Sequence, residues 1–280
     1  FTCREKKMST IETKILFTDL DGTLLNDDKE ISSANMEAIR EMLRRGHKVV
    51  FSTGRATSSA VALAEKLGLT TEGCYAITFN GACIYDLYRG EAISRRPVPL
   101  PLVRRMMDAA YAYDLYAHTY EGTKVLAERD TRELRQYLGY TNMEAVLTED
   151  VCRMLSEDPE KVIVISYDDK EKIQNFQKEI CAWTKGKLDT FFSSDYYLEV
   201  VAPGVSKGSA ILILCEMLGV PIENTVSAGD AQNDISMLET TRIGAAMKNA
   251  DDGVKIHANY ITEHDNNHDG LAEIIHRFIL

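Results

Sequence analysis

The stretch Ile15-Leu16-Phe17-Thr18-Asp19-Leu20-Asp21-Gly22-Thr23 is the most informative part of this 280-residue chain. Its apolar residues predict a short buried strand, and two acids, Asp19 and Asp21, stand at the end of that strand. Gly22 then turns the chain so that both acids face the same opening. Two acids held so close repel each other unless a cation or a shared proton lies between them. The stretch therefore predicts a metal site, an acid/base pair, or both.

Magnesium suits these acids better than calcium does. Mg²⁺ takes few protein carboxylates and keeps ligand positions for water and phosphate oxygens. A calcium loop would begin at Asp19 and place Glu30 twelfth, but Leu24 stands sixth, where that loop needs glycine. It would also need a helix before the loop, whereas residues 14–18 predict a strand. We therefore set the calcium loop aside.

Composition limits the class of protein. The chain is long enough for two lobes, and its net charge of −11 argues against nucleic acid as a partner. No run approaches the roughly 18 apolar residues of a membrane span. Residues 1–7 lack the apolar stretch of a signal peptide, which predicts a cytoplasmic protein, and Met8 is a candidate start. The oligomeric state is not predictable from these features.

The first and last thirds of the chain alternate short apolar strands with amphipathic helices. This alternation is typical of a parallel sheet buried on both faces. The expected strands and helices are 15–18, 33–45, 49–52, 57–67, 75–79, 206–218, 225–228, 233–239, 242–246, 260–261 and 269–279.

Three prolines, Pro97, Pro99 and Pro101, mark a change of pattern. A hairpin at 83–88 and 91–95 precedes them, and helices mixed with strands follow at 102–112, 115–119, 123–127, 132–138, 161–166, 170–182 and 188–193. We therefore predict an α/β fold, a doubly wound parallel-sheet core with an inserted α+β cap. The predicted division is core at 1–86, cap at 87–196 and core again at 197–280.

Thr53-Gly54-Arg55 follows the second expected strand. The carboxyl ends of parallel strands meet at one edge of a sheet, so this turn should lie near Asp19. A small hydroxyl and a free amide are well suited to hold a phosphoryl oxygen. The same letters also form ordinary turns.

Lys207 stands at the start of a helix, after Gly204-Val205-Ser206. A helix N-terminus already carries partial positive charge, so a lysine there suggests that an anion is expected nearby. The alternative is a solvated surface lysine. The spacing does not match a Walker A loop.

The segment Gly229-Asp230-Ala231-Gln232-Asn233-Asp234 follows another expected strand. It places Asp230 at the strand end and Asp234 one helical turn later on the same side. A helix cap would explain one of these acids. It would not explain a glycine, two acids and an asparagine facing Asp19.

Taken in order, these motifs resemble the haloacid dehalogenase superfamily of phosphohydrolases. The closest branch is similar to the Cof-type sugar phosphatases, whose larger cap lies between the third strand and the lysine motif. The resemblance covers residues 14–280, and as a set the motifs are highly specific. The segments that match this branch are Phe79-Asn80-Gly81-Ala82, Leu198-Glu199-Val200 and Ala246-Met247-Lys248-Asn249-Ala250.

The resemblance implies roles for individual residues. Asp19 is the nucleophile that becomes a phosphoaspartate, Asp21 the general acid and base, and Lys207 a catalytic cation. Mg²⁺ would be held by Asp19, the Asp21 carbonyl, Asp230 and Asp234, the last directly or through water. The residues implied on the phosphate or substrate side are Thr53, Gly54, Arg55, Asn80 and Asn233, with Thr23 bracing the loop and Asn80 alternatively a turn residue.

The implied activity is magnesium-dependent hydrolysis of small phosphorylated metabolites, either sugar phosphates or phosphorylated cofactors. A phosphomannomutase-like phosphomutase has the same acids, and a non-catalytic receiver module also combines aspartate, threonine, lysine and magnesium. The receiver module is far shorter and lacks Asp-Gly-Thr after its phosphoacceptor. Which substrate is used is not predictable, and the candidates for the cap side of the pocket are Tyr116, His118, Tyr120 and Arg129.

Overall fold

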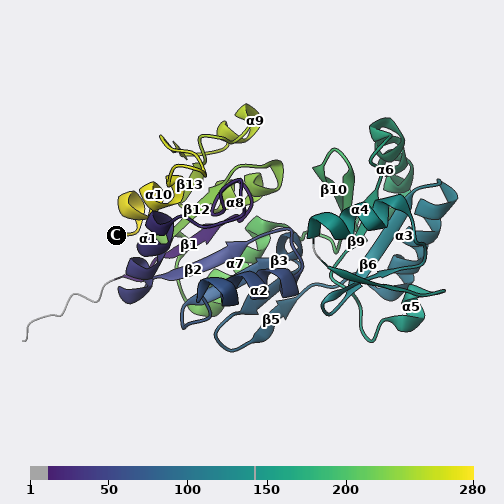
Figure 1. Ribbon diagram of the computed structural model, residues 1–280, viewed down its shortest axis with the longest axis horizontal. Helices are drawn as coiled ribbons and strands as arrows, with labels where there is room; N and C mark the ends of the chain where they lie inside the picture. Colours follow the sequence, from purple (N-terminus) through teal and green to yellow (C-terminus); the bar gives the residue numbers. More distant parts are fainter. Residues whose placement is uncertain (1–11, 142) are drawn as a thin grey trace, which may run out of the picture.

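The computed structural model describes residues 12–141 and 143–280 as two lobes, each built around one β-sheet (Figure 1). The candidate start at Met8 lies outside the described residues. Within the described ranges, no helix is both long and apolar enough to span a bilayer.

The larger lobe, here called the core, holds an eight-stranded sheet. Its strands are β1 (Ile15–Thr18), β2 (Lys48–Ser52), β3 (Cys74–Thr78), β4 (Cys83–Asp86), β5 (Glu91–Arg95), β12 (Thr225–Gly229), β13 (Ile243–Ala246) and β14 (Tyr260–Ile261). Their order is β14-β13-β12-β1-β2-β3-β4-β5, parallel from β14 to β3 and antiparallel at β4 and β5. Strand β1 is therefore central, and Asp19 follows it at the middle of the carboxyl edge.

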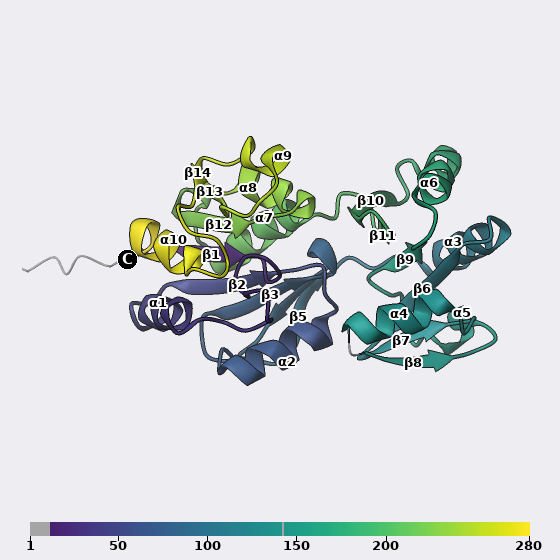
Figure 2. The ribbon, with the colours of Figure 1, turned by 45° about the horizontal axis from the view of Figure 1, so that its top comes forward.

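Helices cover both faces of the core sheet, with α2 (Thr57–Leu67) below the strands and α7 (Lys207–Leu218) above them in Figure 2. Neighbouring residues of a strand point to opposite faces. Leu16 therefore packs among α1 (Ser33–Arg44), α2 and α10 (Gly270–Phe278), while Ile15 and Phe17 pack against α7 and α8 (Ile235–Thr240). This arrangement confirms the predicted doubly wound α/β core. The core helices are α1 (Ser33–Arg44), α2 (Thr57–Leu67), α7 (Lys207–Leu218), α8 (Ile235–Thr240), α9 (Asp252–Lys255) and α10 (Gly270–Phe278), with 3-10 turns η1 (Phe79–Gly81), η2 (Ile222–Asn224) and η3 (Gln232–Asp234).

The smaller lobe, here called the cap, holds a mixed six-stranded sheet. Its elements are α3 (Leu100–Ala112), β6 (Tyr116–Glu121), β7 (Lys124–Ala127), α4 (Arg132–Thr141), β8 (Glu144–Leu147), α5 (Val151–Met154), β9 (Val162–Ile165), α6 (Lys170–Thr184), β10 (Asp189–Ser194) and β11 (Tyr197–Val201). The order is β10-β11-β9-β6-β7-β8. Helices α3, α5 and α6 pack on one face. The other face packs against α4 and against core residues that include Phe79.

Strand pairing differs from the expected boundaries at both ends of the insert. Strand β5, expected in the cap, pairs with β4 in the core sheet, because the hairpin continues the antiparallel pairing of β4 with β3. Strand β11, expected in the core, lies between β10 and β9 in the cap sheet. We therefore propose that the chain crosses between the lobes near residues 96–98 and 202–205, rather than at 86/87 and 196/197.

Four elements were not expected from the sequence: β8, α5, α9 and the strand β11. The helices α5 and α9 have four residues each, too few for a helical period to show. Strand β8 is also short and lies at a sheet edge, with none of its residues fully buried. Elements this short show only a weak sequence pattern. The four unexpected elements therefore leave the predicted architecture unchanged.

Candidate active site

The turns after four neighbouring strands meet at the carboxyl edge of the core sheet. Asp19 follows β1, and its amide donates to the carbonyl of Ala228 at 2.9 Å, which ties it to β12 just before Asp230. Thr53 follows β2, and the amide of Asn80, beyond β3, donates to the Thr53 carbonyl at 3.0 Å. Parallel pairing of these strands therefore brings together segments that are far apart in the sequence.

Lys207 is buried at this edge, with 1% of its surface exposed. Its Nζ lies 2.6 Å from Asp19 Oδ1 and 2.5 Å from Asp234 Oδ1. Burial alone would lower the pKa of Lys207, but the charges of Asp19 and Asp234 outweigh it and raise the pKa above its usual value. Lys207 is thus a buried cation between two carboxyl groups, and the solvated surface lysine is ruled out.

Three carboxyl groups gather around this lysine. Asp19, Asp230 and Asp234 each place an oxygen within 4.8 Å of the others. Burial, together with the neighbouring carboxylates, raises the pKa of Asp19 to about 8 despite the opposing charge of Lys207. Burial likewise raises the pKa of Asp230 to about 6, with Asp234 adding to the effect. The cluster holds more negative than positive charge, as expected of a site that takes a cation.

Asp234 serves as both a cap and a site residue. One of its oxygens accepts the amides of Asp230 at 2.9 Å and Ala231 at 3.0 Å, while the other contacts Lys207. The helix-cap alternative considered for this motif therefore accounts for Oδ2 of Asp234. Its Oδ1 faces Lys207 and the acid cluster.

Gly22 allows Asp230 to approach the loop after β1. Its φ is +81°, and a Cβ built on it would lie 2.4 Å from Asp230 Oδ2, so a larger residue there would displace that carboxylate. Thr23, expected to brace the loop, donates its hydroxyl to Asp230 Oδ1 at 2.7 Å. Asn249 donates its side-chain amide to the Gly22 carbonyl at 2.8 Å.

Asp21 lies outside the carboxyl cluster. Arg55 holds both of its oxygens, with Nε at 2.9 Å and a terminal nitrogen at 2.7 Å, and Lys29 lies 2.9 Å away. Burial raises the pKa of Asp21, but the hydrogen bond and charge of Arg55 outweigh it, and the net pKa is lowered. The two predicted acids therefore have different environments, since Asp19 lies among carboxyl groups beside one cation, Lys207, whereas Asp21 is held by two cations.

Asn80 links two of the predicted substrate-side residues. Its φ of 57° is left-handed, as the turn alternative expected, and its Oδ1 accepts from the Asn233 side chain at 3.1 Å. Its Nδ2 is buried and has no hydrogen-bond partner among the described residues. Because a buried donor without a partner is costly, this amide is suited to an acceptor supplied by a ligand.

Two cavities lie where the cap meets the core. The larger, of about 960 Å³, is lined by Asp21, Arg55 and Lys66 of the core and by Tyr137 and Tyr140 of the cap. The smaller, of about 410 Å³, has in its lining Tyr120, one of the cap-side candidates, and none of the residues predicted for catalysis, phosphate or metal binding. Of the residues predicted for catalysis and metal binding, Asp21 lines the larger cavity together with Arg55, whereas Asp19, Lys207, Asp230 and Asp234 line neither cavity.

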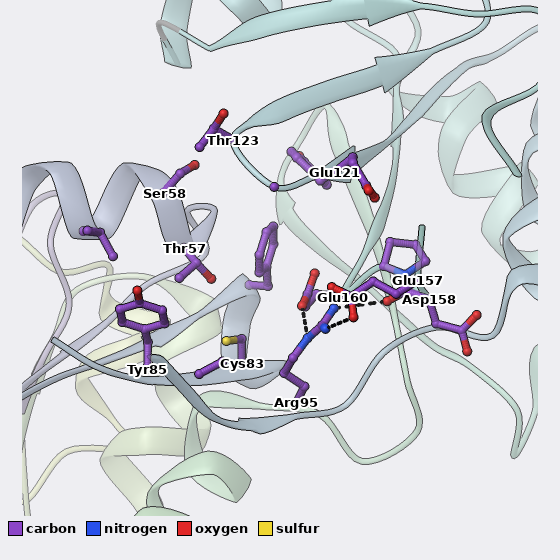
Figure 3. A pocket seen from close by; sticks show the side chains of 16 residues that line it. Thr57, Ser58, Cys83, Tyr85, Arg95, Glu121, Thr123, Glu157, Asp158 and Glu160 are labelled. Atoms are coloured by element: carbon purple, nitrogen blue, oxygen red, sulfur yellow. Dashed lines mark hydrogen bonds and ion pairs between the residues drawn. The ribbon is translucent and has the colours of Figure 1, made fainter. Parts of the chain in front are cut away.

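Figure 3 shows the smaller cavity, where Arg95 reaches toward the cap residues Glu157 and Glu160. The guanidinium pairs with both acids, and its Nε lies 2.7 Å from Glu160 Oε1. Arg95 ends β5 in the core sheet, whereas both acids belong to the cap. The contact therefore joins the two lobes and forms no part of the acid cluster.

The candidates for the cap side of the pocket do not line the larger cavity. Tyr116, His118 and Tyr120 are buried in one hydrogen-bonded group, with His118 Nδ1 and Nε2 at 3.1 and 3.2 Å from the two hydroxyls. Arg129 lies over the ring of Tyr111. Residues 116, 118 and 120 alternate along β6, so they share one face of the cap sheet, the face that packs against α4 and Phe79. The cap side of the larger cavity is formed instead by Thr123, Tyr137, Tyr140, Thr141, Met143 and Glu144.

Comparison with known proteins identifies the family. A model of the haloacid dehalogenase-like hydrolases matches residues 16–275. The chain belongs to this family. The hydrolase is 32% identical to the 5-amino-6-(5-phospho-D-ribitylamino)uracil phosphatase YcsE of Bacillus subtilis, over 96% of this chain and 97% of that protein. It is 27% identical to the pyridoxal phosphate phosphatase YbhA of Escherichia coli, over 96% and 99% of the two chains.

A solved structure agrees with this assignment. A haloacid dehalogenase-like hydrolase from Bacteroides thetaiotaomicron superposes with a TM-score of 0.87 and 31% identity, covering 95% of this hydrolase and 99% of that chain. The resemblance to Cof-type phosphatases is therefore confirmed, and the hydrolase is a phosphatase of this superfamily. This family assignment favours an enzyme over the non-catalytic receiver module.

The acid cluster of this hydrolase fits a divalent cation. Hard cations prefer carboxylate oxygens, and three carboxyl groups converge here beside a single lysine. A divalent ion would favour the ionised forms of Asp19 and Asp230, whose pKa values the crowding raises. Asp21 contributes no side-chain oxygen to the cluster.

Two residues near the site were not predicted from the sequence. Lys29 pairs with Asp21, and Asn249 holds the Gly22 carbonyl. Asn249 lies in the quoted segment Ala246–Ala250, so its motif was a signal without an assigned role. Lys29 is an exposed residue in a charged loop, and nothing in the sequence distinguishes it from an ordinary surface lysine.

Proposed function

We propose that this phosphatase is a magnesium-dependent phosphomonoester hydrolase that acts on small phosphorylated metabolites through a phosphoaspartate on Asp19. The observation that carries the proposal is the convergence of Asp19, Asp230 and Asp234 on the buried Lys207. The family assignment supports phosphoryl chemistry at this convergence.

In the first step, a carboxylate oxygen of Asp19 attacks phosphorus and the bond from phosphorus to the leaving oxygen breaks. The leaving oxygen takes a proton from Asp21. In the second step, Asp21 takes a proton from water, the water oxygen attacks phosphorus, and Asp19 is released with inorganic phosphate. Lys207, at 2.6 Å from Asp19, offsets the negative charge that the incoming phosphoryl group brings.

Asp21 can supply a proton only after its cations release it. Arg55 and Lys29 both donate to its carboxylate, an arrangement that favours the ionised form. A phosphoryl group is a strong acceptor for a guanidinium. We therefore assign to Arg55 a move from Asp21 to the substrate, after which Asp21 takes up a proton from water and can pass it to the leaving oxygen.

The remaining phosphoryl oxygens are assigned to the turn after β2 and to the two asparagines. The Thr53 hydroxyl and the Gly54 amide are donors at a strand end, where a phosphoryl oxygen is well held. The partnerless Nδ2 of Asn80 supports its place on the substrate side, and Asn233 orients it through their hydrogen bond.

Mg²⁺ would be held by Asp19, Asp230 and Asp234, together with the Asp21 carbonyl implied by the family. When bound, it supplies positive charge that stabilises the transferring phosphoryl group.

Two observations support a small phosphorylated metabolite as the substrate. The larger cavity, of about 960 Å³, is lined by Asp21 and Arg55 of the core and by Tyr137 and Tyr140 of the cap. The named relatives act on a phosphorylated ribitylaminouracil and on pyridoxal phosphate. We extend this chemical class, polar ring compounds with one phosphate, to the present chain.

The test is phosphate release from a panel of sugar phosphates and phosphorylated cofactors with Mg²⁺, with the Asp19→Asn variant as the blank. We expect release that stops when EDTA removes the metal. Full activity without a divalent metal would refute the magnesium site. Turnover that depends on an added sugar bisphosphate, without net phosphate release, would replace the hydrolase with the phosphomutase alternative.

A further inference from the structure

One cationic side chain of the cap reaches the turn that we assign to the phosphoryl group. Lys161, next to β9, is 3% exposed, and its Nζ lies 3.3 Å from the carbonyl oxygen of Gly54. The same Nζ lies 2.8 Å from Glu199 Oε2 on β11. The rings of Phe79 and Tyr120 lie 5.6 and 5.3 Å from it. The ammonium group is therefore enclosed, with one acid and one carbonyl as its polar neighbours.

The carbonyl that Lys161 holds belongs to the same peptide group as the amide of Arg55. That amide donates to the Thr53 hydroxyl oxygen at 3.2 Å. A cation on the oxygen of a peptide group strengthens its N–H as a donor, because the hydrogen bonds polarise one another in surroundings of low polarity. Lys161, one peptide group and the Thr53 hydroxyl thus form a continuous chain of contacts from cap to core.

This chain of contacts restricts the direction of the Thr53 hydroxyl, because it occupies one lone pair of the oxygen. Its oxygen accepts from Arg55, and among the described residues its hydrogen is donated to no acceptor. A hydroxyl whose lone pair is occupied has its hydrogen available for another group, here an oxygen of the phosphoryl group. Lys161 is also absent from the lining of the larger cavity, so it acts on the turn and not on the leaving group.

We propose that Lys161 is a positioning residue of the phosphatase reaction: from the cap, it holds the Gly54–Arg55 peptide so that the Thr53 hydroxyl donates to the transferring phosphoryl group. The inference rests on the proposed function. Glu199 balances the charge of the buried ammonium and keeps it at the turn. The phosphoryl site is then completed only while the cap sits against the core.

A double-mutant cycle tests the proposal. The variant Lys161→Met/Glu199→Gln removes the ammonium without leaving an unpaired buried carboxylate. We expect kcat to fall about 10- to 100-fold, because small misplacements of a positioned donor are costly, and KM to change less than about threefold. In a Thr53→Val background the same two substitutions should cost less than about threefold, because their target is already absent.

Two esters with different leaving groups provide a second criterion. Because Lys161 acts on the phosphoryl side, the loss of kcat should be equal for both esters. Equal costs of the Lys161 substitutions with and without Thr53 would overturn the proposal, as would a loss confined to one ester. The matched control is Lys170→Met/Asp195→Asn, which removes an exposed ion pair of the cap and should leave kcat unchanged.

A binding measurement separates failure of this inference from failure of the proposed function. Inorganic phosphate should raise the melting temperature of the wild type, and should do so less in both Lys161→Met/Glu199→Gln and Thr53→Val. If the wild type hydrolyses no ester, the proposed function fails, and the phosphate shifts still decide the role of Lys161. Equal increases in melting temperature for the wild type and both variants would refute the role of Lys161.

Discussion

The core and the cap bury charge in different ways. At the carboxyl edge of the core sheet, Lys207 pairs with Asp19 and Asp234, and Asp230 lies beside these two acids, so negative groups outnumber the positive one. In the cap, Lys161 and Glu199 form one buried pair with equal and opposite charges. The charges of the cap pair cancel, whereas the excess negative charge of the core cluster favours a bound cation. The difference teaches that an excess of one charge, more than burial, distinguishes the cluster where we propose that a cation and a phosphoryl group bind.

Removing the nucleophile is the strongest test of the unbalanced cluster. Asp19→Asn should lower kcat at least about ten-thousandfold, because an amide cannot attack phosphorus. The fold should persist, since the amide keeps the shape of the carboxyl group. Phosphate release and thermal melting of the purified variant check both statements. Asp28→Asn, at an exposed aspartate of the following loop, is the matched control. Normal turnover by Asp19→Asn would remove the nucleophile assignment.

Unbalancing the cap pair should mainly affect stability. Glu199→Ala leaves the Lys161 ammonium buried without its carboxylate, at an expected cost of about 3–5 kcal/mol in the free energy of unfolding. Asp195→Ala, in an exposed pair with Lys170 of the same lobe, should cost less than about 1 kcal/mol. Urea unfolding measures both values. Similar costs for the two variants would show that the cap pair is not enclosed as described.

Displacing one acid of the core cluster should reduce activity more than stability. In Gly22→Ala the new methyl group would meet Asp230 Oδ2, and we expect kcat to fall about a hundredfold. Gly46→Ala is a matched control, because Gly46 has a similar φ of +84° with no atom within 4 Å of the added carbon. It should lose about 1 kcal/mol of stability from strain and keep its activity. Equal kinetics for the two variants would contradict a role for the Gly22 contact.

The smallest expected effect is a pH dependence of stability in the cap. Burial, and then the charge of Lys161, hold the pKa of His118 well below its usual 6.5. The unfolded chain takes up a proton below about pH 6.5 that the folded protein does not, so stability falls as the pH drops, by about 1.4 kcal/mol per pH unit. His118→Gln removes this titration. Urea unfolding at about pH 7.5 and about pH 5.5 should show a smaller loss for the variant, and an equal loss would contradict the assignment.

The same contrast explains what could be predicted from the sequence. The core acids follow short apolar strands, and parallel pairing brings strand ends together, so the sequence alone places Asp19, Thr53 and Asp230 at one edge. Lys161 and Glu199 instead lie at or near strands in the middle of the chain. Their pairing depends on β9 lying beside β11, and a sequence pattern does not reveal which strands become neighbours. For the same reason the residues that form β5 and β11 were assigned to the other lobe.

The different environments of Asp19 and Asp21 were also beyond the sequence. The two acids are two residues apart and were expected to share one opening. Their side chains nevertheless differ in their partners, because Arg55 and Lys29 reach Asp21 alone. The position of a long, flexible side chain depends on packing in the folded protein, so the motif predicted the two acids but not the pairing of Asp21 with Arg55 and Lys29.

Arg96 gives the molecule a mechanical property. It lies on the first crossing between core and cap, and its guanidinium donates to the carbonyls of Pro203 and Gly204 on the second crossing, the latter at 3.0 Å. Because the two crossings are hydrogen-bonded to each other, they act as a single hinge. A hinge of this kind resists sliding and separation of the lobes and leaves rotation as the easy movement. Opening would therefore swing the cap along one arc, and each closure would return Lys161 to the same carbonyl.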